Sequence, residues 1–498
     1  MLSIITDLKK LHHFTRAILC ADTMGGINLE NERLDNEDKI SRLGLSLMVI
    51  LAGSFLAPLQ MHSSTLAIPA IAAEMGLTAD IISWFTLSQV LASACFVLPA
   101  GKLSDRFGRR RMFVCGLLIC SIACFIGGVA FNGYLILLAR ALQGIGAALV
   151  FAAAVALLVS VPPEDQKVRV MGIYISVVYV GMVTGPLFGG FVIEQLDWRY
   201  VFYVPGTLFL ILTVIGFGYI KWERYGDRNT RIRLLDLSLY IGALLLMAFG
   251  VYDATHFEGQ VLLVSGVVAF AAFCWFQSKR RDPLLQVKLF TQSRTFTILG
   301  IAHFLSYVSI LALPFTLTLY LQYLKGVDAQ STGMILLVQA LFTAIIAPFS
   351  GRLSKHFRPR HLIFTGVGLF VVACLMLASL VPESSIWVVV VALALMGASV
   401  GVMDTPIVHT SMSTVDNSLL GSASATMNGL RTMGGFIGMG LISYLMGLHL
   451  GNAVIEPSLY PQLMKVVGQF FQVAVFTALL TLILLVYGVL TRPRREYD

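Results

Sequence analysis

The sequence predicts an all-α integral membrane protein with fourteen transmembrane helices, arranged as two six-helix bundles with two inserted central helices. Three observations predict this fold. Hydrophobic residues make up 57% of the 498-residue chain and charged residues only 12%, whereas soluble domains carry about 25% charged residues. Uncharged stretches recur that are long enough to cross the hydrocarbon core, which takes about 20 apolar residues. A ten-residue segment also recurs in a related form.

Dividing the uncharged stretches at polar, glycine or proline positions gives the expected helices. In chain order they are 44–70, 81–100, 112–130, 133–160, 170–193, 200–220, 236–254, 258–277, 295–321, 331–350, 361–381, 385–409, 419–447 and 467–490. The seventh is the least regular, because Asp236 and Asp253 bound it. The five tryptophans lie within a few residues of an expected helix end, where amphipathic rings favour the membrane interface.

The basic residues predict the orientation. Of the 35 Lys and Arg residues, 30 fall in the tails and connectors of one face, three on the other face (Arg199, Lys325 and Lys465) and two, Arg140 and Arg431, inside spans. Because positive connectors stay inside, we expect a bacterial inner-membrane protein with both termini in the cytoplasm. The net charge of +8 therefore reports topology, and we expect no nucleic-acid partner.

The expected organisation has five parts. These are a cytoplasmic tail at 1–43, an N-terminal six-helix bundle at 44–220, an inserted two-helix segment with its linkers at 221–294, a C-terminal six-helix bundle at 295–490 and a second cytoplasmic tail at 491–498. The first tail has apolar residues at helical spacing with basic residues between them, which predicts a helix lying in the membrane plane. A disordered tail, or a start at Met24, is the alternative.

Several classes of activity lack their sequence signals. The seven cysteines lie in the spans or the first tail and form no CxxC pair, so they are interpreted as small apolar residues rather than metal ligands or disulfides. The chain has no GxxxxGK[ST], HExxH or GxSxG motif. We therefore expect no metal, no cofactor and no enzymatic activity, and any energy for transport must come from an ion gradient.

The repeated segment divides the chain into comparable halves. Residues 101–110 read Gly-Lys-Leu-Ser-Asp-Arg-Phe-Gly-Arg-Arg, and residues 351–360 read Gly-Arg-Leu-Ser-Lys-His-Phe-Arg-Pro-Arg. The copies follow the second and tenth expected helices, so each half holds six helices and two are inserted between them. Parallel repeats are typical of transporters, which hold cargo near the midplane between halves.

The first copy contains more than a positive-inside signal. Its notable residues are Gly101, Asp105, Arg106, Gly108, Arg109 and Arg110. A topology signal would explain the arginines but not the two glycines and the aspartate. In the second copy, Lys355 stands in place of Asp105 and Arg358 in place of Gly108, so we expect the two copies to act asymmetrically.

Two further motifs lie inside spans. The fourth span carries Arg140, Gln143 and Gly144. A cation inside the membrane is costly and should face a cavity or a partner, unless the side chain reaches back to the interface. The fifth span carries Gly181, Gly185, Pro186, Gly189 and Gly190. Small residues at this spacing permit close helix contact and the proline permits a bend, although such packing is common in membranes.

These three motifs resemble those of the drug:proton antiporter-2 members, the fourteen-helix branch of the major facilitator superfamily, over essentially the whole chain. The resemblance implies alternating access between the two six-helix halves. It implies that the first motif is a cytoplasmic gate, whose carboxylate and arginines latch the halves together. It also implies that the third motif marks an exporter rather than an importer. Trp198, Arg199 and Phe202 also match the family.

The first span departs from the family pattern. Relatives usually have an aspartate there, within an LDxTIVNVALP-like stretch, whereas alignment on Pro69 places Gln60 at that position. Gln60 cannot titrate, so the usual coupling residue is missing. His62 lies about 12 Å inside the outer end, level with Arg140, by helical rise. Histidine titrates near neutral pH, so His62 is a candidate proton carrier, with a neutral, hydrogen-bonded lining histidine as the alternative; His303 is a further candidate.

The leading candidate for the proton carrier is Asp404, a carboxylate well inside the twelfth span, followed by Thr405 and Pro406. Intramembrane carboxylates are costly and usually functional; the alternative is a structural hydrogen bond to the backbone that Pro406 frees. Arg431, in the thirteenth span, is a further polar candidate, but helical rise places it more than about 10 Å from Asp404 along the membrane normal. We therefore do not expect that ion pair.

The sequence predicts a proton-coupled efflux transporter that exports small amphiphilic compounds or drugs by alternating access. The expected partners are the lipid bilayer, a small-molecule cargo and protons. The main alternative is a dedicated exporter of an anionic metabolite or siderophore, because Arg140 has no family acid to pair with. An importer and a non-transporting membrane sensor are further alternatives. The resemblance also raises a tripartite pump with a periplasmic adaptor and an outer-membrane channel.

Overall fold

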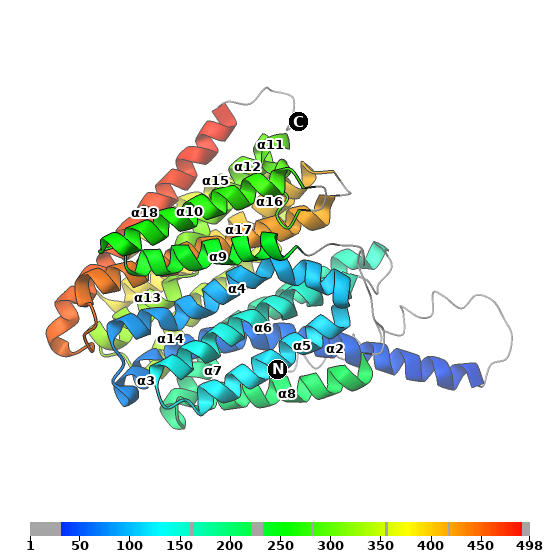
Figure 1. Cartoon of the computed structure of the whole chain (residues 1–498), viewed down its shortest axis with the longest axis horizontal. Helices are drawn as coiled ribbons and strands as arrows, with labels where there is room; N and C mark the ends of the chain where they lie inside the picture. The colour runs from blue at the N-terminus through cyan, green and yellow to red at the C-terminus, as the bar shows by residue number, and fades with distance from the viewer. Residues whose placement is uncertain are drawn as a thin grey trace.

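The computed structural model describes residues 31–159, 164–220, 233–280, 283–353, 357–416 and 419–490. Long helices run side by side through the molecule, so that it forms one elongated bundle (Figure 1). Within the described ranges, fourteen helical segments are long and apolar enough to cross a membrane. The prediction of an all-α membrane protein with fourteen spans is confirmed.

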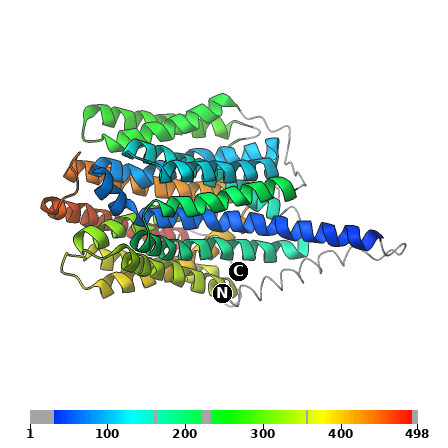
Figure 2. The same cartoon turned by 90° about the horizontal axis from the view of Figure 1, so that it is seen from below.

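The N-terminal half contains six spans and one short helix. Its elements are α2 (Asn31–Leu66), α3 (Ile68–Met75), α4 (Ala79–Phe107), α5 (Arg109–Gly128), α6 (Gly133–Val159), α7 (Glu164–Gln195) and α8 (Tyr200–Tyr219). Helix α2 runs unbroken from Asn31, so residues 31–43 lengthen the first span and do not form a separate helix (Figure 2). The rest of the tail predicted at 1–43 lies outside the described residues.

Two long helices form the insertion. They are α9 (Leu234–Tyr252) and α10 (Phe257–Ser278), followed by the short α11 (Lys288–Gln292). The hairpin lies along one side of the bundle (Figure 2), where α9 contacts both α4 and α17. The hydroxyl of Tyr240 donates a 2.7 Å hydrogen bond to the carbonyl of Ala94 in α4. The inserted pair therefore packs where the two halves meet.

The C-terminal half again contains six spans. Its elements are α12 (Arg294–Ile310), α13 (Leu313–Leu319), the π-helix η1 (Tyr320–Leu324), α14 (Ala329–Leu353), α15 (Pro359–Ala378), α16 (Ile386–Ser413), α17 (Leu420–Leu450), the 3₁₀-helix η3 (Pro457–Leu459) and α18 (Tyr460–Leu490). The span expected as one helix at 295–321 is broken after Ile310. Pro314 has no N–H to donate to the carbonyl of Ile310, four residues earlier, which explains why the helix is interrupted here.

The two ends of the bundle differ, and we call one of them the α3 end. It contains α3, the α7–α8 connection and the α17–α18 connection; the sequence predicts that it faces the periplasm. Three hydrogen bonds join the halves there: Ala79 N–H to the Ala453 carbonyl at 2.8 Å, Ser83 with Ser443 at 2.8 Å, and the Gln322 side chain to the Leu66 carbonyl at 3.2 Å. The structure therefore has the halves joined at this end.

Candidate functional site

A fully buried arginine lies between three helices of the N-terminal half. The guanidinium of Arg140, in α6, donates to the Ser64 hydroxyl of α2 at 2.6 Å and to the Phe85 carbonyl of α4 at 3.2 Å. It also donates to the Gln143 side chain at 3.0 Å and lies 4.5 Å from the centre of the Phe85 ring. All of these partners are neutral, and Nη2 has no hydrogen-bond partner among the described residues. The guanidinium does not reach back to the interface.

Gly144 permits this arrangement. A Cβ built on Gly144 would collide with the Gln89 carbonyl and lie 3.0 Å from the Ala92 Cβ, both in α4. The absence of a side chain therefore lets α6 approach α4 closely enough for Arg140 to reach the Phe85 carbonyl. Packing alone explains Gly144, whereas the cost of burying Arg140 among neutral groups points to a function beyond packing.

Gln60 and His62 occupy different surroundings in α2. The Gln60 amide donates to Ser64 at 3.4 Å, which connects it to Arg140 through one hydroxyl. His62 is half-buried and backs onto α7, where a Cβ built on Gly185 would lie 2.8 Å from its Cβ. Its imidazole makes no hydrogen bond within the described part of the chain, but it lies within electrostatic range of both Arg140 and Arg431.

A second polar cluster lies in the C-terminal half. The Asp404 carboxylate of α16 lies 3.3 Å from Nδ1 of His303 in α12, and both side chains are largely buried. The His303 ring lies 4.7 Å from that of Tyr307, one turn further along α12. Arg431 of α17 places its guanidinium 4.8 Å from the centre of the Tyr307 ring. One carboxylate, one imidazole, one phenol and one guanidinium thus form a chain of contacts across three helices.

The close approach of α17 to α12 explains how Arg431 reaches this cluster. A Cβ built on Gly434 would lie 3.1 Å from the Tyr307 Cβ. The separation of Arg431 from Asp404 along the membrane normal was overestimated. It was counted from an expected helix end near 409, whereas α16 continues to Ser413. Counted along the helices from their observed ends, both residues lie about 14–17 Å from the ends of α16 and α17 that face each other across the 414–419 connection. They interact electrostatically without forming a direct ion pair in the described ranges.

Asp404 is not the partner of the backbone carbonyl that Pro406 leaves without its helical N–H donor. The missing proline N–H would have paired with the carbonyl of Val402, and the hydroxyl of Ser350 in α14 donates to this carbonyl at 2.9 Å instead. One carboxylate oxygen of Asp404 receives no well-directed hydrogen bond within the described residues. The structural alternative for Asp404 thus lacks support, and the carboxylate keeps capacity for a proton.

The glycines of the fifth span mark two helix contacts. Cβ atoms built on Gly181, Gly185 and Gly189 would press on Phe55, on His62 and on Ser63 of α2, the last at 2.7 Å. Gly190 faces the other half instead, 2.7 Å from the carbonyl of Ala329 in α14. A Cβ on Gly333 in α14 would in turn collide with the carbonyl of Pro186. The motif therefore joins α7 to its own half along one face and to the opposite half at the α3 end.

The repeated segment is helical for most of its length. Helix α4 continues through Asp105 and Arg106 to Phe107, and Gly108, with φ of 106°, provides the turn into α5. Gly101 lies within the helix, with nothing near its Cβ position. Gly108 therefore provides the turn, and Gly101 does not take part in it.

The polar contacts of this segment that we observe lie inside the N-terminal half. Arg109 pairs with Asp105 at 3.1 Å and donates to the Ala156 carbonyl of α6 at 3.1 Å. Arg110 donates to the Phe217 carbonyl of α8 at 2.6 Å. The arginines thus tie α5 to α6 and α8. Lys355, in the second copy, lies outside the described residues.

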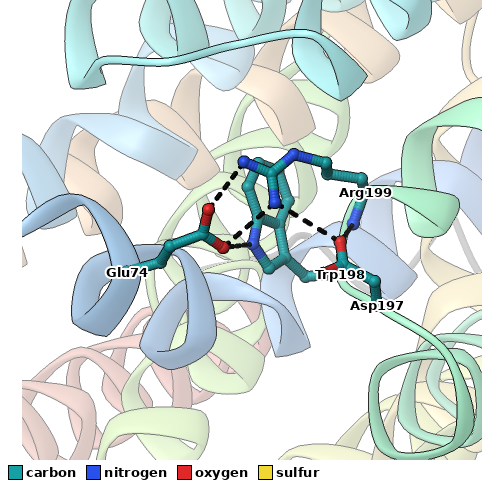
Figure 3. Close-up of polar contacts among 4 residues, drawn as sticks. All are labelled: Glu74, Asp197, Trp198 and Arg199. Atoms are coloured by element: carbon teal, nitrogen blue, oxygen red, sulfur yellow. Dashed lines mark hydrogen bonds and ion pairs between the residues drawn. The ribbon is translucent and has the colours of Figure 1, made fainter.

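At the α3 end, a polar cluster at the surface, in which only the Trp198 side chain is buried, ties α3 to the α7–α8 connection (Figure 3). The Glu74 carboxylate accepts from the Trp198 indole N–H at 2.6 Å and from the Arg199 guanidinium at 2.6 and 3.1 Å. Arg199 also stacks on Trp198 and lies 3.6 Å from Asp197. Hydrogen bonds from Arg199 and Trp198 hold the pKa of Glu74 below its ordinary value of 4.5. Below this cluster, Phe202 is fully buried against Gly127.

Comparison with known proteins decides the family. The sequence profile of the Major Facilitator Superfamily matches residues 50–439 and 299–498. The chain belongs to this superfamily. The fourteen spans and the repeated segment fit this membership, and the superfamily is one of membrane transporters of small molecules.

Curated relatives cover most of the chain. It is 29% identical over 425 residues to the multidrug resistance protein Stp of Mycobacterium tuberculosis, covering 83% of this chain and 78% of Stp. It is 30% identical over 412 residues to the puromycin resistance protein pur8 of Streptomyces alboniger, covering 80% of each. It is 24% identical over 363 residues to the riboflavin transporter RibZ of Clostridioides difficile, covering 72% of this chain and 78% of RibZ.

Sequence reasoning found the charged members of both clusters but missed their neutral partners. Ser64, Phe85 and Tyr307 had no signal as single residues. The spacing of His303 and Tyr307, four residues apart and so on one helix face, is the pattern that would have connected them. The expectation that the protein binds no metal stays a prediction. The described part of the chain shows no group of three or more His, Cys, Asp or Glu side chains placed to hold a metal.

Proposed function

We propose that this protein is a proton-coupled exporter of small amphiphilic compounds, in which the C-terminal cluster around Asp404 carries the proton and the N-terminal half binds the cargo. The observation that carries the proposal is the contact of Asp404 with His303, 3.3 Å apart and largely buried. A proton shared by a carboxylate and an imidazole at this distance can reside on either group. The Asp404 oxygen that faces His303 receives no well-directed hydrogen bond from the described residues, so it has room for that proton.

The neighbouring cation gives this cluster a coupling mechanism. The Arg431 guanidinium lies in electrostatic range of the Asp404 carboxylate, only one aromatic ring away, on Tyr307. A change in the distance between α12, α16 and α17 would alter this influence and so alter how tightly Asp404 holds its proton. Because the three helices belong to one half, a rearrangement within that half during transport would release or capture the proton.

Alternating access requires the halves to separate at the α3 end. There Gly190 and Gly333 hold α7 against α14 with backbone contacts on both sides, and three hydrogen bonds join the halves. We propose that this seam is closed here and opens when cargo leaves. The resemblance assigns the Gly101–Arg110 segment to a gate at the opposite end, where Asp105 and Arg109 would stiffen the α4–α5 corner.

The buried charges favour a second candidate function, the dedicated export of an anionic or zwitterionic metabolite. Arg140 is fully buried and has only neutral partners, whereas the half-buried Arg431 lies in electrostatic range of the Asp404 carboxylate. An anionic group would compensate Arg140 if the helices parted to admit it. The names of Stp and pur8 favour drug export, while that of RibZ shows that a relative can serve a single metabolite.

Everted membrane vesicles test the proposed function. Under a proton gradient that is acid inside, a proton antiporter that exports cargo from the cell accumulates cargo inside everted vesicles, while a proton-symporting importer depletes them. Ethidium, a lipophilic cation, and a carboxylate dye such as fluorescein serve as the two probes. We expect gradient-dependent accumulation of at least one of them. No accumulation of either, together with wild-type drug sensitivity of a deletion strain, would contradict drug export.

A further inference from the structure

A groove on the membrane-facing surface lies outside both polar clusters. It has a volume of about 630 Å³ and is formed by α4, α6 and α9, where the inserted hairpin meets the N-terminal half. Tyr134, Leu138 and Phe249, which line it, are 51–76% exposed. Because these helices cross the membrane, the groove opens toward lipid rather than toward the seam between the halves.

The groove has one polar end. At the α3 end, the carboxylate of Asp80 accepts from the hydroxyl of Thr78 and, at 3.4 Å, from the hydroxyl of Tyr252 in α9. No lysine, arginine or histidine in the part of the chain that the structure describes forms an ion pair with Asp80. The carboxylate therefore has its hydrogen-bond donors in place but lacks a cation, at the depth where lipid headgroups lie.

Aromatic rings and then apolar side chains follow below Asp80. Trp84 lies 5.2 Å from Phe249 and 5.7 Å from Tyr252, ring centre to ring centre. Electron-rich faces of this kind favour a nearby ammonium group. Deeper in the groove, Phe96 of α4 and Ile241 of α9 contribute apolar side chains.

The length of the groove favours a chain-like occupant. The lining residues extend from Asp80 to Phe96 along α4, about 24 Å, and from Tyr252 back to Ile241 along α9, about 16 Å. One leaflet of the hydrocarbon core is about 15 Å thick. A groove that starts at headgroup depth and runs the full depth of a leaflet matches an acyl chain better than a compact cargo molecule.

We propose that this groove binds one phospholipid of the leaflet at the α3 end, with a primary ammonium headgroup at Asp80 and an acyl chain between α4 and α9. A primary ammonium can donate charge-assisted hydrogen bonds to the carboxylate, which a quaternary ammonium cannot. An anionic headgroup would be repelled. Since α9 also contacts α17, the bound lipid lies beside the place where the hairpin bridges the two halves.

Native mass spectrometry of the full chain tests the proposal, using equal mixtures of phosphatidylethanolamine, phosphatidylcholine and phosphatidylglycerol with identical acyl chains. We expect the wild-type protein to retain phosphatidylethanolamine at least threefold over the other two. Asp80→Asn should remove this preference. Asp328→Asn, which changes another aspartate at the α3 end, should keep it. Ala141→Phe, which fills the groove without changing charge, should lower the retention of all three lipids.

Three outcomes would overturn the proposal. Equal or stronger retention of phosphatidylglycerol by the wild type would contradict recognition of an ammonium group. An unchanged preference in Asp80→Asn would remove the assigned headgroup contact. Displacement of phosphatidylethanolamine by tetraphenylphosphonium, a lipophilic cation, would assign the groove to cargo instead of lipid. None of these measurements depends on transport, so their results test the lipid-binding proposal without testing the proposed export function.

Discussion

The two halves of the molecule surround their buried charges differently. In the N-terminal half, Arg140 is enclosed by neutral groups, and Gln60 stands where the family resemblance leads us to expect an acid. In the C-terminal half, Asp404 lies against His303, with Arg431 one ring away. The difference teaches that a duplicated bundle need not repeat its chemistry: one half presents a fixed charge, while the other presents groups that can exchange a proton.

His62 connects the two sites. It is in α2 of the N-terminal half, yet it lies within electrostatic range of Arg431 as well as Arg140. Its neighbour Gly185 permits α7 to pack directly on it. Charges interact strongly in the low-dielectric interior, so a change of protonation at His62 would be felt in both halves.

The largest effect should come from the seam where the halves meet. Gly333→Ala places a Cβ against the Pro186 carbonyl, so the α3 end cannot close fully and transport should fall at least tenfold. Gly368→Ala, at a helical glycine with open space around its Cβ position, is the matched control. Cargo uptake into everted vesicles measures the rate. Wild-type uptake by Gly333→Ala would show that this contact is not needed for transport.

Restoring an acid to the N-terminal half should change the choice of cargo. Gln60→Asp introduces a carboxylate next to Ser64, the hydroxyl that Arg140 contacts, so the site loses its net positive charge. We expect resistance to ethidium, relative to extrusion of a carboxylate dye, to rise about tenfold, equivalent to about 1.4 kcal/mol. Gln60→Asn is the neutral control. An unchanged ratio would place cargo recognition elsewhere.

A smaller effect should follow from removing the ring that separates Arg431 from His303. Tyr307→Leu removes the cation–π contact with Arg431, and we expect a loss of stability of about 1–2 kcal/mol. Tyr307→Phe keeps the ring and should remain close to wild type. Thermal unfolding in detergent compares the two variants. Equal losses would show that the hydroxyl, rather than the ring face, stabilises the cluster.

The smallest effect concerns the surface ion pair of Glu74 with Arg199, which packs over the buried Trp198. Because the pKa of Glu74 is lowered, its contribution to stability is present at neutral pH and disappears as the pH falls through that lowered pKa. Glu74→Gln should therefore cost less than about 1 kcal/mol at pH 7 and nothing at the lowest pH. Melting curves between pH 7 and pH 3 check this. A constant difference across that range would contradict the ion pair as its cause.

The sequence predicted the fold better than the site, for physical reasons. Uninterrupted apolar runs mark the spans, so all fourteen could be predicted. The breaks at Ala67 and near Pro314 were missed, and so were several helix ends, among them those of α4, α7, α16 and α18. Helix ends matter for sites, since a difference of four residues at the end of α16 changed the apparent depth of Asp404 by about 6 Å. The contacts of Asp404 with His303 and of Arg431 with Tyr307 depend on how helices pack, which glycines such as Gly434 decide.

The most direct test of the account is whether cargo moves protons through Asp404. In proteoliposomes loaded with a pH-sensitive dye, adding cargo to the wild-type protein should drive proton movement. Asp416→Asn, at an exposed aspartate just beyond the end of α16, should behave as the wild type. We expect Asp404→Asn still to bind cargo but to move no protons in response to it. Cargo-driven proton movement that persists in Asp404→Asn would contradict the central claim.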